Sequence, residues 1–166
     1  MHEHDDVVLQ AINPAFGQLG HFFVIIAFVA AVVATIGYFF AAKNERDPAA
    51  SGAWHKLGRG AFYTHAAAIV GIVITLFFMI FNHHFEYQYV WQHSSMDLPV
   101  KYILSCFWEG QEGSFLLWSF WIMVLGVFLT FKAKSWEKPV MTFIALQQVF
   151  LVSFLLGVYI LGRKVG

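Results

Sequence analysis

The 166-residue chain is strongly apolar: 59% of its residues are hydrophobic, 19% are aromatic and only 12% are charged. That charged fraction is about half of what an ordinary soluble domain carries. The charges are also clustered, because four long stretches contain no Asp, Glu, Lys or Arg. This distribution excludes a water-soluble enzyme, and it directs attention to the four charge-free stretches.

Each charge-free stretch is long enough to cross most or all of a bilayer as a helix, at about 1.5 Å per residue against a hydrocarbon core of roughly 30 Å. We therefore predict an all-α integral membrane protein with four transmembrane helices, over residues 22–42, 61–81, 115–131 and 140–161. The first helix is expected to be retained. Residues 1–21 contain acids but no Lys or Arg, which is the wrong charge for a secretory signal.

The basic residues indicate an orientation. Of ten Lys and Arg residues, four lie in segment 43–60 and three in segment 132–139. Short basic loops stay in the cytoplasm, so these two segments are predicted to be cytoplasmic loops. The N-terminal segment 1–21, the segment 82–114 and the tail 162–166 are predicted to be extracytoplasmic, which places both termini outside.

The outer segment 82–114 is rich in aromatic, acidic and histidine residues, a composition typical of the membrane–water interface. Pro99 interrupts it, and the amphipathic run Val100–Trp108 predicts a short interfacial helix. Glycines then bend the chain before the third span. Ser114 is expected to cap that span, with Glu112 near the positive end of the helix dipole.

Eight histidines in a membrane protein raise the possibility of haem held between helices. His21 and His65 are expected near opposite faces of the bilayer, so they cannot share one iron, and His65 is expected to be a hydrogen-bonded interface histidine. His83, His84 and His93 share the outer face with His21, where they could contact a planar cofactor or act simply as interfacial polar residues. Without an i, i+4 pair or an H-E-x-x-H spacing, no metal site is predicted.

Two further features predict helix packing. Ala30, Ala34 and Gly37 on the first span, and Ala67 and Gly71 on the second, have the spacing that lets helices approach closely in lipid. Two adjacent amides lie inside the fourth span, at positions 147 and 148. Unpaired amides are costly in hydrocarbon, so both should face another helix or subunit, at least one of them as a packing contact.

The entry to the third span carries a long and unusual string that resembles a segment of CcmF-type haem lyases, in the CcmF/CcsA family of cytochrome c maturation. In that family the segment precedes and enters a transmembrane helix. The resemblance rests on His93-Ser94-Ser95, Leu98-Pro99, Lys101-Tyr102 and Trp108-Glu109-Gly110-Gln111-Glu112-Gly113-Ser114-Phe115-Leu116-Leu117-Trp118.

The resemblance implies a component of cytochrome c biogenesis in the bacterial inner membrane. Such lyases attach haem to the paired thiols of apocytochrome c on the extracytoplasmic face, and a membrane-bound haem chaperone delivers the haem. Family members are several times longer, so this chain would correspond to the amino-terminal part. The haem ligands and the catalytic groups would then lie outside it, in the remainder of the polypeptide or in other membrane subunits.

Site residues carried over from the resemblance are Trp108, Gly110, Glu112, Gly113, Ser114 and Trp118. Candidate cofactor contacts on the outer face are His83, His84, His93, Trp108 and Trp118. We hypothesise that Glu112 and the two tryptophans shape the surface on which haem or apocytochrome is handled. Glu112 has an alternative structural role, in which its carboxylate fixes the loop by accepting backbone N–H bonds.

Two other functions fit the same residues: a haem- or quinone-binding electron-transfer subunit, and a structural or transporter-associated subunit without chemistry. The lone Cys106 lies in an apolar run and is interpreted as a small buried hydrophobe. His55 is expected to be solvated within the basic segment 43–60. That segment contacts lipid and sets orientation, and nucleic acid is not expected as a partner.

Overall fold

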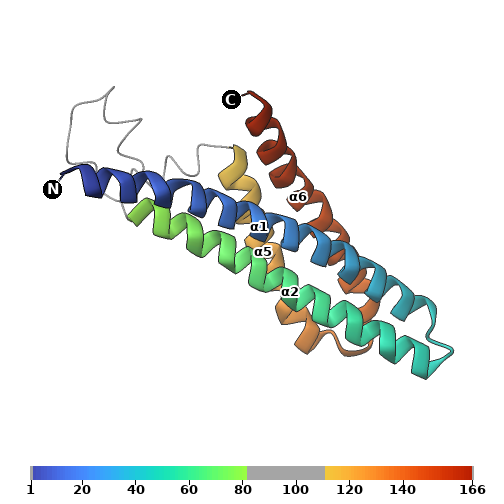
Figure 1. The fold of residues 1–166 in the computed structure, drawn as a ribbon. Helices are drawn as coiled ribbons and strands as arrows, with labels where there is room; N and C mark the ends of the chain where they lie inside the picture. The colour runs from blue at the N-terminus through green and yellow to red at the C-terminus, as the bar shows by residue number, and fades with distance from the viewer. Residues whose placement is uncertain (1, 82–110, 166) are drawn as a thin grey trace.

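The computed structural model describes residues 2–81 and 111–165, and every regular element in these two ranges is helical (Figure 1). Four helices are long and apolar enough to cross a membrane. The chain is therefore a multi-pass membrane protein. The predictions of an all-α class and of four helices long enough to span a membrane are confirmed for these two ranges. The elements are α1 (His2–Lys43), α2 (Pro48–Phe81), α5 (Gln111–Lys132), the short 3-10 helix η1 (Lys134–Trp136) and α6 (Glu137–Val165).

The helices extend well beyond the charge-free stretches. Helix α1 includes most of the predicted N-terminal segment, and α2 begins at Pro48, inside the predicted loop 43–60. Helix α5 begins at Gln111, so Gly113 and Ser114 lie in its first turn. The predicted helix cap at Ser114 and the predicted bend at Gly113 are therefore wrong. A charge-free run marks the part of a helix that suits hydrocarbon, and the backbone hydrogen bonds continue into polar sequence.

The start of α2 has a clear local cause. The Oδ1 atom of Asp47 accepts hydrogen bonds from the backbone N–H groups of Ala49 at 3.1 Å and Ala50 at 3.3 Å. These donors belong to the first turn of the helix, where they have no intrahelical partner. Pro48 occupies the first helical position, where a missing N–H costs nothing. The connection from α1 is consequently a tight turn.

The helices form a bundle in which α1 lies beside α2, α6 packs against α1 and α5, and α5 also contacts α2. The end of α1, the start of α2, the end of α5 and the start of α6 lie together and carry seven of the ten Lys and Arg residues. We call this the basic end. The start of α1, the end of α2, the start of α5 and the end of α6 form the opposite end, which we call the motif end. Both ends of the described chain therefore lie at the motif end.

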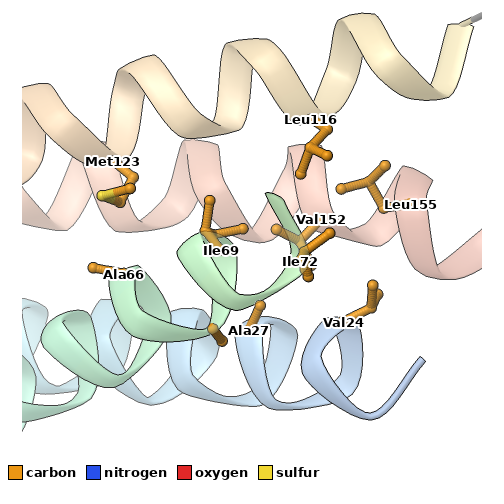
Figure 2. Close-up of a cluster of buried hydrophobic side chains, with 10 residues drawn as sticks. Val24, Ala27, Ala66, Ile69, Ile72, Leu116, Met123, Val152 and Leu155 are labelled. Atoms are coloured by element: carbon orange, nitrogen blue, oxygen red, sulfur yellow. The ribbon is translucent and has the colours of Figure 1, made fainter. Parts of the chain in front are cut away.

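A core of buried apolar side chains joins all four helices (Figure 2). Its members are Val24, Ala27, Ala66, Ala68, Ile69, Ile72, Leu116, Met123, Val152 and Leu155. Three of them are alanines, as expected where helices associate by close packing in lipid. Of the predicted small-residue contacts, Ala30, Ala34 and Gly37 are buried and Gly71 faces Phe23, but Ala67 is exposed. The prediction for Ala67 was therefore wrong.

Candidate functional site

The described part of the motif forms the first turns of α5. Gly113 is buried and Leu116 belongs to the core, whereas Trp118 points away from the bundle and is 57% exposed. The Trp118 ring meets the ring of Phe115 edge-on, with centroids 5.9 Å apart. Phe115 in turn stacks on Phe154 of α6 at 5.1 Å. The motif therefore continues into a membrane-spanning helix and presents an aromatic surface at the motif end.

The remaining predicted site residues fall mostly outside the described part of the chain. This is true of His83, His84, His93, Trp108 and Gly110, of Cys106, and of the predicted interfacial helix Val100–Trp108. Glu112 lies in the first turn of α5, but its side chain is also outside the description. His21 lies within α1 at a partly exposed position.

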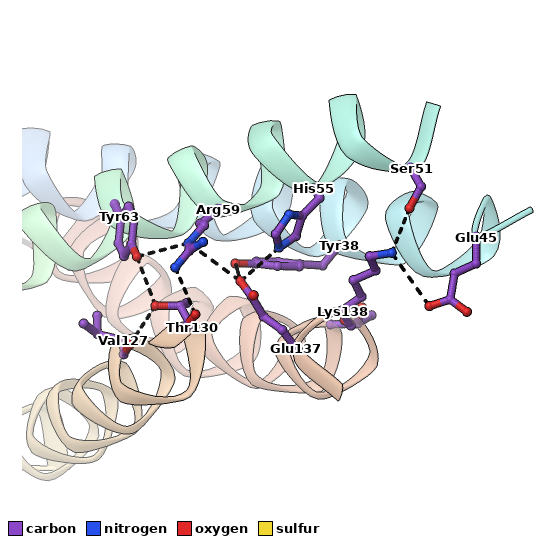
Figure 3. A network of polar contacts seen from close by, with 11 residues as sticks. Tyr38, Glu45, Ser51, His55, Arg59, Tyr63, Val127, Thr130, Glu137 and Lys138 are labelled. Carbon is purple, nitrogen blue, oxygen red and sulfur yellow. Dashed lines mark hydrogen bonds and ion pairs between the residues drawn. The ribbon is translucent and has the colours of Figure 1, made fainter. Parts of the chain in front are cut away.

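Sequence analysis missed a buried polar network at the basic end, centred on Glu137 (Figure 3). Glu137 is the first residue of α6 and only 6% exposed. Its Oε1 atom lies 3.0 Å from Nε2 of His55 and 3.8 Å from Nε of Arg59, and it accepts a hydrogen bond from the Tyr38 hydroxyl at 3.3 Å. The His55 contact is a close approach at ion-pair distance and does not have the geometry of a directed hydrogen bond.

Arg59 extends the network to α5. Its Nη2 atom donates to the carbonyl oxygen of Thr130 at 2.9 Å, and its Nε atom donates to the Tyr63 hydroxyl at 3.2 Å. That hydroxyl lies 3.0 Å from the Thr130 hydroxyl, which donates to the Val127 carbonyl at 2.7 Å. Because Thr130 is in the last turn of α5, its carbonyl has no partner within the helix. A cation therefore satisfies the negative end of the α5 dipole.

Lys138 makes a second connection between α6 and the α1–α2 hairpin. Its Nζ atom donates to the Ser51 hydroxyl at 2.9 Å and lies 3.8 Å from a carboxylate oxygen of Glu45. The Ser51 hydroxyl donates onward to the Ala41 carbonyl at 2.8 Å. Together the contacts of Glu137, Arg59 and Lys138 connect all four helices at the basic end.

This network corrects the interpretation of His55 as a solvated loop residue. His55, Arg59 and Tyr63 are spaced four residues apart, so they lie on one face of α2. A face that presents histidine, arginine and tyrosine toward a bundle requires an acceptor, and Glu137 is the acid adjacent to the fourth span. The sequence therefore carries a signal for this network in the four-residue spacing of His55, Arg59 and Tyr63.

A second polar cluster lies within the membrane-spanning part of the bundle. The Ser119 hydroxyl donates to Oε1 of Gln148 at 2.6 Å, and Nε2 of Gln148 donates to the Ser119 carbonyl at 2.8 Å. Both residues are fully buried, and so is His65. Nδ1 of His65 lies 2.8 Å from the Ala27 carbonyl, which confirms His65 as a hydrogen-bonded interface histidine.

The Ala27 carbonyl fixes the tautomer of His65. A carbonyl can only accept, so Nδ1 carries a hydrogen that it donates to Ala27. Nε2 has no hydrogen-bond partner among the described residues, although the Gln148 side chain lies beside the ring. The cluster thus joins α1 to α2 and α5 to α6 by one polar layer, far from the ends of the helices.

Both polar clusters connect neighbouring helices to one another. Glu137, Tyr38 and His65 are buried between helices. The described ranges contain no group of three or more His, Cys, Asp or Glu residues arranged to hold a metal ion. A shallow apolar groove of about 360 Å³ lies on the outer side of the α1–α2 pair, between Ile25, Ile26, Val29, Ala30, Val33, Ala61 and Thr64. Comparison with protein-family models, with curated proteins and with solved structures found no match to this chain.

Proposed function

We propose that this chain is a membrane component of cytochrome c biogenesis and corresponds to the amino-terminal part of a CcmF-type haem lyase. The observation that carries the proposal is the motif at the start of α5. Its described residues enter a membrane-spanning helix, with Gly113 against the bundle and Trp118 on the exterior. The family string likewise runs into a transmembrane helix.

The distribution of charge supports an orientation for this component. Seven of the ten basic residues gather at the basic end, which the positive-inside rule places in the cytoplasm of a bacterial inner membrane. The motif end then faces the extracytoplasmic side. Haem attachment to apocytochrome takes place on that side in the family.

The proposed role of the motif is to present a surface and not to perform catalysis. Trp118, together with Glu112 and Trp108, would form part of the outer surface that receives haem from a chaperone or contacts the apocytochrome. Aromatic side chains suit this role because they offer a large rigid contact area. The haem ligands and the catalytic groups would come from the rest of the lyase.

Two tryptophans one helical turn apart on α5 provide the test. Trp118 belongs to the motif, and Trp121 does not, yet Trp121 is similarly exposed at 61%. In a host whose cytochrome c maturation depends on this chain, Trp118→Ala should lower haem-stained holocytochrome c by roughly tenfold, the scale of losing an aromatic contact residue. Trp121→Ala should leave it close to wild type.

Membrane abundance of each variant, measured by immunoblot, separates loss of function from loss of protein. Equal holocytochrome c in the wild type and both variants at equal abundance would contradict the proposed role of Trp118. Normal cytochrome maturation in a strain that lacks the chain altogether would contradict the proposed function itself.

A further inference from the structure

The two adjacent glutamines of α6 face opposite environments. Gln148 is buried and both ends of its amide are hydrogen-bonded to Ser119. Gln147 is exposed on the outer face of α6, and its side chain makes no hydrogen bond to any residue of the described ranges. It lies ten residues after Glu137, about 15 Å along the helix. This depth is well inside the span, where an unpaired amide is costly.

The residues around Gln147 form a seam. Phe143, Gln147, Phe150 and Phe154 are spaced by four, three and four residues along α6, and all four are exposed. This is the spacing with which one helix packs against another at a shallow left-handed crossing. Phe154 also stacks on Phe115 of α5, so the seam is continuous with the bundle surface at the motif end.

We propose that this seam is a dimer interface, in which α6 packs against α6 of a second copy of the chain around a two-fold axis along the membrane normal. Two copies in one membrane share the same orientation, so the axis brings the two Gln147 side chains to the same depth. A carboxamide offers both a donor and an acceptor. Each Gln147 can therefore donate to the other, and one contact satisfies both buried amides.

Self-complementarity distinguishes a second copy from other occupants. A lipid chain cannot accept a hydrogen bond from Gln147, and a helix of another protein would need a polar residue at the matching depth. The second copy supplies that residue by symmetry. This interface does not depend on the proposed function, because it uses only α6 and none of the motif.

Disulfide crosslinking in native membranes tests the contact directly. Cys106 is the only cysteine of the chain, so Phe150→Cys in a Cys106→Ser background introduces one reporter thiol within the seam and keeps Gln147. Mild oxidation should convert most of the protein to a dimer on a non-reducing gel. Ile74→Cys in the same background is the matched control, because Ile74 is 62% exposed on α2, and it should crosslink only weakly.

The energetic role of the amide is tested by resonance energy transfer between labelled copies in lipid bilayers. Gln147→Leu should raise the dimer dissociation constant on the order of tenfold, the scale of one or two interhelical hydrogen bonds in lipid. Gln147→Asn keeps an amide and should retain most of the association. Circular dichroism checks that both variants keep the helical content of the wild type.

Three outcomes would overturn the proposal. They are crosslinking of the Phe150→Cys variant no stronger than that of the Ile74→Cys control, no energy transfer between wild-type copies, and equal association of the wild type and Gln147→Leu. In the first two cases the seam would be covered by lipid or by a helix of a different protein. In the third case the dimer would use another surface.

Discussion

Gly37 of α1 and Gly58 of α2 mark the closest approach of the two helices. A β-carbon on Gly37 would lie 2.6 Å from both the Cα and the backbone nitrogen of Gly58, and one on Gly58 would lie 2.8 Å from the backbone nitrogen of Tyr38. Real β-carbons do not come so close to backbone atoms. The crossing therefore requires glycine on both helices. Gly58 lies three residues after His55 and immediately before Arg59, so this close approach sets the position of the Glu137 network.

We expect Gly37→Ala and Gly58→Ala each to destabilise the bundle by about 1–3 kcal/mol, the usual cost of forcing an extra carbon into a packed site. The midpoint of SDS-induced unfolding in mixed micelles, followed by circular dichroism, measures this. Gly52 and Gly60 are the controls, because a β-carbon at either would meet nothing within 4 Å. Alanine there should be neutral or slightly stabilising, since it is the better helix former. Equal effects at all four positions would contradict the close crossing.

The Glu137 network predicts that two glutamates at the same end of the bundle contribute very different amounts to the unfolding free energy. Glu137→Gln removes the charge that faces Arg59 and His55 in a buried site, and should lower the unfolding free energy by about 1–3 kcal/mol. Glu45→Gln removes the carboxylate that pairs with Lys138. Because the Glu45 side chain is 58% exposed, this change should lower the unfolding free energy by less than about 0.5 kcal/mol. Unfolding in mixed micelles compares them. A Glu137→Gln variant as stable as Glu45→Gln would show that the network contributes little.

The four spans could be predicted from charge alone, because hydrocarbon excludes ionised side chains over a fixed thickness. The ends of the helices could not be predicted in this way, because the helices continue through polar sequence beyond each span. Position along the helix also left open which of two adjacent glutamines faces inward, since neighbouring residues point about 100° apart. The rotation of α6 decides this, and the rotation follows from packing against Ser119 and the other helices. The Glu137 network had a sequence signal in the spacing of His55, Arg59 and Tyr63, but its acceptor is more than seventy residues away along the chain.

The turn between α5 and α6 contains a strained position. Lys134 has a φ angle of 48°, in the left-handed region that side chains with a β-carbon disfavour. Lys134→Gly should therefore be neutral or stabilising by up to about 1 kcal/mol, despite the entropy that glycine adds to the unfolded chain. Lys132→Gly is the control. Lys132 is also exposed but belongs to α5, so glycine there should destabilise by about 0.5–1 kcal/mol. If both variants lost the same amount of stability, Lys134 would not be strained.

The opposite environments of Gln147 and Gln148 predict opposite consequences for the isolated monomer. Gln148→Leu leaves the Ser119 hydroxyl and carbonyl without their partner inside the bundle, so we expect a loss of about 1–2 kcal/mol of unfolding free energy. Gln147→Leu removes an amide that has no partner within the described bundle, so it should be neutral or slightly stabilising in detergent at dilutions where the protein is monomeric.

The pair Ser119→Ala and Gln148→Leu, combined in a double-mutant cycle, should show coupling of about 1 kcal/mol. Ser119→Ala combined with Gln147→Leu should show none. Coupling of Ser119 to Gln147 instead would mean that α6 is rotated by one residue, and it would invalidate the polar cluster around His65 together with the seam on the outer face.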